Sequence, residues 1–186
     1  MKKCAAVIIL FLLLSGCSGQ SNEMDAGMHL RSNLLQAEGC SFQAAITADY
    51  GDKIHAFTLS CNADAGGDMT FTVIEPKTIA GISGKLSGEG GKLTFDGTAL
   101  NFELLTEDQL SPISAPWILL KTLRSGFITS CCTEEKSLRL SVDDSYKDDA
   151  MRLDIWLDSD HLPDRAEILH NGRKILSVTV EQFEIL

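Results

Sequence analysis

The sequence has 186 residues, a formal net charge of −10 and 44% hydrophobic residues. An acidic chain repels nucleic-acid phosphates and anionic lipid headgroups, because binding either of them needs clustered Lys and Arg. We therefore expect no nucleic-acid partner. Any membrane attachment must come from an apolar or lipidated segment rather than from a basic surface.

The first sixteen residues have the pattern of a secretory signal peptide. Lys2 and Lys3 precede an apolar run from Ala5 to Leu14, and two small residues follow it. This run is too short to span a bilayer, which needs roughly 20 apolar residues. The pattern predicts that the chain is exported and that residues 1–16 are removed.

The segment Leu14 to Cys17 reads Leu-Ser-Gly-Cys and resembles the lipobox of bacterial lipoproteins. In a lipobox the cysteine thiol receives a diacylglycerol and becomes the first residue of the mature chain. Two or three acyl chains, such as palmitate, hold a protein on a bilayer because each buried methylene contributes about 0.8 kcal/mol. We predict lipidation of Cys17 and attachment to the extracytoplasmic face of the cell membrane. The alternative is an ordinary cleaved signal that a cysteine follows by chance.

The predicted mature chain has 170 residues and a net charge of −12, because Lys2 and Lys3 leave with the signal. This length fits one domain with one core. Residues 17–23 are small and polar, which predicts a lipidated tether, and residues 24–186 form the folded domain. We expect a monomer.

The domain begins with a predicted helix. Asn22 can cap its start, and Gly39 can end it in the left-handed conformation. Its apolar residues fall roughly on one face: Met24, Met28, Leu34 and Leu35.

From Cys40 the apolar residues alternate with polar ones, which predicts a hairpin of strands 40–47 and 55–61. A two-residue loop at Tyr50-Gly51 pairs Phe42 with Leu59, Ala44 with Phe57, and Cys40 with Cys61. Cysteines at such a position, about 4.5 Å apart between Cα atoms, can form a disulfide worth roughly 3 kcal/mol. The alternative is a pair of buried thiols.

The rest of the chain repeats the alternation, and about ten strands are predicted in all. Asn171-Gly172 is typical of a tight hairpin turn, and Pro76 ends a strand because it lacks an amide donor. The remaining strands are expected at 69–75, 79–86, 92–96, 100–104, 127–132, 138–142, 151–157, 162–170 and 173–186.

One helix is predicted within this run of strands, from Ser111 to Ser125. Ser111 is a good N-cap, Pro112 suits the first turn, and Gly126 follows as a stop. Its apolar residues point in more than one direction, so either the helix is sandwiched or one face lines a cavity.

No catalytic or metal-binding pattern stands out, and we predict no cofactor, no metal and no enzymatic activity. The four histidines are scattered, and Asp158-Ser159-Asp160 lacks the glycine and the closing glutamate of a calcium loop. A weak surface calcium site on the loop 143–149 is the one alternative. Cys131 and Cys132 should point to opposite faces of a strand and stay unpaired.

Several short segments resemble the closing strands of LolA-like proteins. These are Trp156-Leu157-Asp158, Leu162-Pro163, Glu167-Ile168, Asn171-Gly172 and Phe183. The stretch from Phe42 through residues 76–81 to Phe102 is similar to small Firmicutes lipoproteins of the same superfamily. In the carrier LolA an arginine inside the cavity holds the lid, and no arginine of this sequence is matched to it.

The resemblance implies an α+β, mainly β fold: an antiparallel sheet curled into a half-barrel, with the N-terminal and middle helices covering its concave face. It also implies a hydrophobic cavity that holds a lipid or an acylated protein segment. The alternative is an envelope sensor or adaptor, like RseB, that binds another membrane protein. The candidate lining residues are Phe42, Phe57, Leu59, Phe71, Val73, Trp117, Leu120 and Leu123.

The lipobox prediction is tested by mapping the first residue of the mature protein. We expect a chain that begins at Cys17 and carries acyl chains, measured by mass spectrometry of the membrane-extracted protein. A mature terminus at any other residue would refute lipidation at this site.

Overall fold

One curved antiparallel sheet of eleven strands dominates the described part of the chain, which is residues 19–186 without 52, 104, 107–108 and 148–149. The computed structural model orders them β6-β5-β4-β3-β2-β1-β13-β12-β11-β10-β9. The strands are β1 (Gly39–Asp49), β2 (Ile54–Asp64), β3 (Met69–Glu75), β4 (Ser83–Ser87), β5 (Gly90–Phe95), β6 (Thr98–Phe102), β9 (Phe127–Glu134), β10 (Ser137–Asp143), β11 (Arg152–Leu157), β12 (Pro163–His170) and β13 (Arg173–Ile185).

Only one pair of neighbours in this sheet, β1 and β13, is not consecutive along the chain. The chain therefore starts in the middle of the sheet and meanders out to the edge strand β6. It then passes through the short pair β7 (Leu105–Thr106) and β8 (Gln109–Leu110) and a helical segment, and reaches the opposite edge at β9. From β9 it meanders back to the middle.

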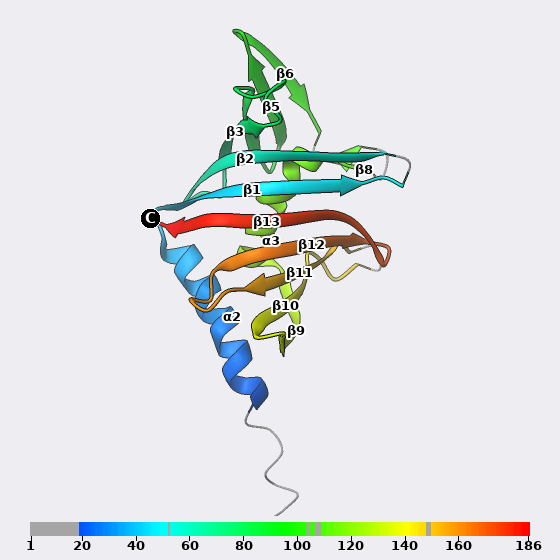
Figure 1. Ribbon diagram of the computed structural model, residues 1–186. Coiled ribbons are helices and arrows are strands. Elements are labelled where there is room, and N and C mark those ends of the chain that lie inside the picture. Colours follow the sequence, from blue (N-terminus) through cyan, green and yellow to red (C-terminus); the bar gives the residue numbers. More distant parts are fainter. Residues whose placement is uncertain (1–18, 52, 104, 107–108, 148–149) are drawn as a thin grey trace, which may run out of the picture.

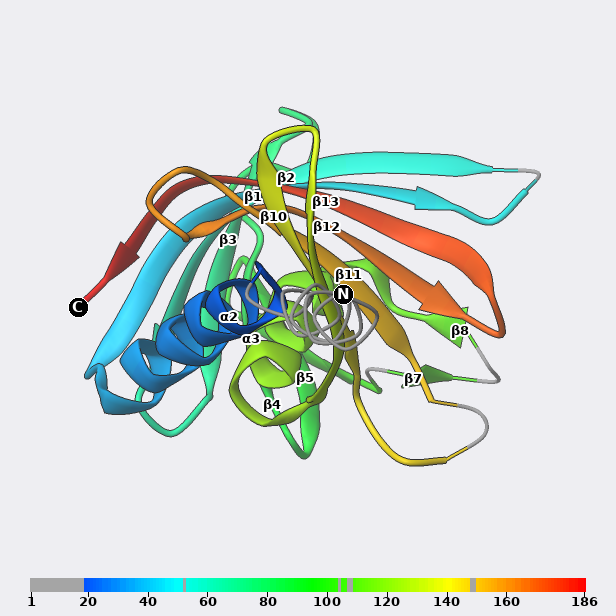
Figure 2. The same cartoon turned by 90° about the horizontal axis from the view of Figure 1, so that it is seen from below.

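Two helices lie on the concave side of the sheet, α2 (Gly19–Gln36) and α3 (Ala115–Ser125) (Figure 2). The predicted class is thus confirmed: a mainly β, α+β fold with one open, curled sheet and two covering helices. The core lies between the sheet and these helices, and its largest fully buried side chains include Ile46, Leu59, Leu119 and Leu140.

Helix α2 begins earlier than predicted, at Gly19, so residues 19–23 of the predicted tether are helical. The prediction of its buried face was right for Leu34 and for Met24, which packs against the core, but wrong for Met28 and Leu35. Leu30 and Leu34 are buried, and α2 crosses β10 where Gly27 lies against the Leu140 side chain. Met28 and Leu35 are about half exposed. Leu30 lies four residues before Leu34, and Gly27 lies three residues before Leu30, so these three positions share the inner face.

The predicted register of the first hairpin was wrong by two residues. Phe42 pairs with Cys61, Ala44 with Leu59, and Ile46 with Phe57. The loop has four residues, because the Tyr50 amide donates to Lys53 O at 3.0 Å and the Gly51 amide donates to Asp49 Oδ1 at 2.7 Å. An aspartate that binds its own turn in this way favours the longer loop.

The start of the middle helix differs from the expectation in one detail. A short 3₁₀ turn, η1 (Pro112–Ser114), precedes α3, and the Ser111 side chain caps neither segment. Instead the Ser114 hydroxyl donates back to Ser111 O. Ser111 therefore occupies the predicted N-cap position, with Pro112 in the first turn, but its side chain makes no capping hydrogen bond; the predicted range of the helical segment was right.

Gly126 ends α3, but not through a left-handed conformation, since its φ is −74°. Glycine is required there by close packing. A Cβ atom at this position would lie 2.7 Å from Thr122 O and 2.8 Å from Val142 Cγ1. The absence of a side chain thus lets α3 approach β10.

We expect Gly126→Ala to lower the free energy of unfolding by about 1–3 kcal/mol, because the added methyl group meets backbone that cannot easily move. Gly88→Ala is the matched control, since no heavy atom lies within 4 Å of the added methyl. Urea denaturation of both variants measures the difference. Equal stabilities would show that the contact with Thr122 is not a constraint.

Candidate ligand site

The eight predicted lining residues do come together on the concave side, but as packed core. Leu59 is 0% exposed, Phe42, Phe71, Val73 and Leu123 are 2–3% exposed, and Phe57 is partly buried against them. The middle helix is sandwiched, with eight of its residues buried. Of the predicted set, Trp117 and Leu120 alone line the pocket described next.

A pocket of about 380 Å³ lies along one face of α3. Trp117, Leu120, Lys121 and Arg124 line it, and their spacing of three and four residues puts them on one helical face. The β2–β3 turn, residues 65–68, forms a second wall, and Leu35 of α2 contributes a third. The volume lies near the lower end of the range for ligand pockets, about 300–1,000 Å³.

Backbone carbonyls of the β2–β3 turn hold α3 beside this pocket. Trp117 Nε1 donates to Gly67 O at 2.9 Å. The Arg124 guanidinium donates to Ala65 O at 2.8 Å and to Asp64 O at 3.2 Å. The turn is itself closed by Asp64, whose Oδ1 accepts the Asp68 amide at 3.1 Å. The two walls are therefore fixed relative to each other.

An arginine also joins the two helices, which the sequence patterns did not reveal. Arg31 of α2 donates from Nε to Leu123 O, near the end of α3, at 2.6 Å. Burial lowers the pKa of Arg31, and its Nη2 is buried without a hydrogen-bond partner in the structure. The one sequence signal for this contact is a charged residue placed between Leu30 and Leu34.

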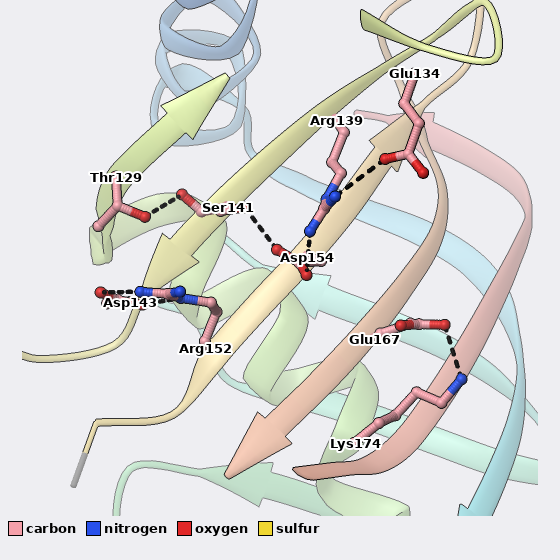
Figure 3. Close-up of polar contacts among 9 residues, drawn as sticks. All are labelled: Thr129, Glu134, Arg139, Ser141, Asp143, Arg152, Asp154, Glu167 and Lys174. Carbon is pink, nitrogen blue, oxygen red and sulfur yellow. Dashed lines mark hydrogen bonds and ion pairs between the residues drawn. The ribbon is translucent and has the colours of Figure 1, made fainter. Parts of the chain in front are cut away.

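The outer face of the sheet carries a second polar cluster, which is structural. Arg139 donates to Asp154 at 2.6 Å and to Glu134 at 3.1 Å, and the Ser141 hydroxyl also donates to Asp154 at 2.6 Å (Figure 3). The hydrogen bond to Asp154 raises the pKa of Arg139. Arg139 forms ion pairs with both Asp154 and Glu134, so every charged side chain of this cluster has a partner of opposite charge. The cluster therefore offers no free acid, base or nucleophile.

Among the described residues, no group of three or more His, Cys, Asp or Glu side chains is arranged to hold a metal ion. The loop 143–149, considered above as a weak calcium site, is described only in part, because Asp148 and Asp149 lie outside the described residues. Asp143 is engaged by Arg152, with its Oδ1 2.9 Å from Nε. In the same part of the chain, no helix has both the length and the apolar character needed to cross a bilayer.

The cysteines depart from the predicted disulfide. Cys40 pairs with Ala63, so Cys61 is its diagonal neighbour, and both are buried free thiols. Diagonal neighbours typically lie about 7–8 Å apart, beyond the usual Cα separation of a disulfide, about 4.4–6.8 Å. The geometric basis for the bridge is therefore lost. Cys131 is buried and Cys132 exposed, which confirms that they point to opposite faces.

Neither a family model nor a curated protein matches the sequence. Solved structures do resemble the fold. A LolA superfamily protein from Nitrosomonas europaea has a TM-score of 0.45 and 8% identity, over 86% of this chain and 93% of its own. The Mycobacterium tuberculosis lipoprotein LppX has a TM-score of 0.42 and 10% identity, over 87% and 93%. A chain of the Pseudomonas aeruginosa MucA/MucB complex has a TM-score of 0.41 and 13% identity, over 86% of this chain and 56% of its own.

Burial of the Cys40, Cys61 and Cys131 thiols predicts that they react slowly in the folded protein. It raises the pKa of Cys40 and of Cys131 to about 11, and it also raises the pKa of Cys61, so all three stay protonated at pH 8. The thiolate is the reactive form. In the predicted mature chain, where the Cys17 thiol is already acylated, we expect iodoacetamide to modify Cys132 alone in the folded protein, as measured by peptide mass spectrometry.

Unfolding without a reductant provides the second arm of this experiment. Cys40, Cys61 and Cys131 should then all become reactive, because their protection comes from burial. If Cys40 and Cys61 react only after reduction, they form a disulfide and the free-thiol assignment is wrong.

Proposed function

We propose that this chain is a lipid-anchored, non-enzymatic protein of the extracytoplasmic face of the cell membrane, which binds a lipid or an acylated protein segment in the pocket beside α3. The observation that carries the proposal is the composition of that pocket. Trp117, Leu120 and Leu35 present apolar surface to an opening of about 380 Å³. Burial of an acyl chain there is favourable by roughly 25 cal/mol per Å² of apolar surface.

The site is smaller than a cavity that runs along the whole sheet. Leu59 and Val73 are buried in the core, so the ligand binds in the pocket along the face of α3 that carries Trp117 and Leu120. Leu35, about half exposed on α2, gains from burial by a ligand. The pocket suits one chain rather than several.

The predicted anchor fits the arrangement of the elements. The helix α2 begins at Gly19, so a single residue, Ser18, separates it from the acylated Cys17. The start of α2 lies at the bottom of Figure 1, and β5 and β6 lie at the top. With Cys17 in the bilayer, the β5–β6 hairpin is therefore the part most distant from the lipid.

Substitution of Leu35 tests the ligand site. We expect Leu35→Glu to weaken binding of a fluorescent long-chain fatty acid at least about tenfold, because a carboxylate replaces apolar wall. Met28→Glu is the matched control: Met28 is also about half exposed on α2 but does not line the pocket. Fluorescence titration gives both dissociation constants. Absence of binding by the wild-type protein, with no lipid in its native mass spectrum, would rule out the carrier function.

The adaptor function is favoured by a different feature, the uncovered edge strand β6. Its sequence, Thr-Ala-Leu-Asn-Phe, has no charge, whereas the other edge strand, β9, packs against α2. On the side that faces the core, Leu93 lies opposite Leu100, and Leu100 and Phe95 are 63% and 59% exposed. Unpaired strand edges with apolar faces are places where another chain can add a strand.

A photo-crosslinking residue at position 100 tests the adaptor function in cells. We expect one stoichiometric protein to be captured, and Leu100→Lys to weaken its association with the chain several-fold. Tyr146, 84% exposed in the loop between β10 and β11, supplies the control position. Equal capture from both positions, or none from position 100, would contradict an adaptor edge at β6.

A further inference from the structure

We propose that the pocket beside α3 takes an anionic amphiphile, with a carboxylate or phosphate head at Lys121 and Arg124 and a single acyl chain against Trp117, Leu120 and Leu35. This inference rests on the proposed function and names the class of ligand. Its basis is an apolar wall and two cations on the same helical face, within a protein of net charge −10.

The spacing of the α3 residues divides the pocket into an apolar and a cationic part. Trp117 and Leu120 are 8% and 4% exposed, so their side chains form the inner wall. Lys121 is exposed and Arg124 half-buried, and both line the same opening. A ligand whose chain lies on the inner wall therefore carries its head past both cations.

The carboxylates near the opening are already engaged. Asp68 lines the pocket, but its Oδ2 lies 2.6 Å from Lys85 Nζ, in an ion pair that raises the pKa of Lys85. Asp64 Oδ1 accepts the Asp68 amide. The ion pairs recorded among the described residues include neither Lys121 nor Arg124. Both pocket cations are therefore without a carboxylate partner in that part of the chain.

The two cations differ in what they offer to a head group. The Lys121 ammonium lies 5.1 Å from the centre of the Trp117 ring, a contact that leaves its three N–H donors free to bind an anion. Arg124 uses two of its five N–H donors on Ala65 O and Asp64 O. Arg124 is thus a fixed positive charge at the rim, and Lys121 is the mobile donor.

This arrangement distinguishes an anionic ligand from a neutral one of equal chain length. A neutral alcohol or ester is stabilised by burial of its acyl chain, but it leaves Lys121 and Arg124 without an anionic partner. A carboxylate or phosphate gains the same burial and adds charge-assisted hydrogen bonds, which are stronger than neutral ones. We expect a preference of about tenfold for the anion at low ionic strength, reduced by salt.

The test compares three ligands with one chain length: dodecanoate, dodecyl phosphate and dodecanol. Each displaces the neutral fluorescent probe N-phenyl-1-naphthylamine from residues 17–186, the predicted mature chain, which contains every residue that the structure describes. The expected result is tighter binding of at least one anion than of dodecanol. The stronger of the two anions identifies whether the head is a carboxylate or a phosphate.

Two lysine variants locate the effect. Lys121→Gln should bring the ratio of anion to alcohol affinity towards one, and Lys121→Arg should restore it. Lys92→Gln, an exposed lysine of β5 that does not line this pocket, should keep the wild-type ratio. Circular dichroism melting curves verify that each variant is folded, and the Arg variant keeps the test informative if the Gln variant is not.

The outcomes separate this inference from the proposed function. If dodecanol binds as tightly as both anions, the inference is overturned and the hydrophobic site stands. If none of the three ligands binds, the proposed lipid-binding function itself fails. A preference for anions that Lys121→Gln leaves unchanged would also overturn the assignment of the head group to Lys121.

Discussion

The pairing of β1 with β13 is the contact on which the rest of the structure depends. All other neighbours in the sheet are joined by short connections, so they form locally, whereas this pair joins Cys40 to Ile185 and Ala48 to Leu176 across the chain. Such long-range pairing must overcome a large loss of chain entropy before it is stabilised. Once formed, it joins two meanders into one curved surface. Helix α3 belongs to the connection between their outer edges, and it crosses the concave side, where its apolar residues are buried.

Much of this fold was predictable because local sequence patterns determine most of its strands and helices. Alternation of apolar residues identified the strands of both meanders, and Asn171-Gly172 marked a turn in which both residues have positive φ, 51° and 73°. The composition of the segment 111–125 identified a helix with apolar residues on several sides, and its burial beneath the sheet explains them. The strand β4 begins at Ser83 rather than at Ile79, since residues 79–81 lie in the turn that follows Pro76.

The errors arose where three-dimensional contacts decide between local alternatives. Asp49 selects a four-residue loop by binding the Gly51 amide, and this moved the register by two and separated Cys40 from Cys61. The contact of Arg31 with Leu123 O spans 92 residues, so no local pattern could reveal it. The same limit applies to the pocket. Its apolar wall from α3 was predicted through Trp117 and Leu120, but the β2–β3 turn and Leu35 reach it only through the folding of distant segments.

The unbroken course of α2 from Gly19 to Gln36 has a mechanical consequence. An 18-residue helix is about 27 Å long and resists bending, unlike a string of glycine and serine. Because α2 packs against the concave side of the sheet through Leu30 and Leu34, the helix and the sheet form one body, and acyl chains on Cys17 would be separated from that body by Ser18 alone. Leu35 lies near the opposite end of the helix from Gly19, so in the proposed lipid-anchored protein the length of α2 would separate the pocket from the acylated residue.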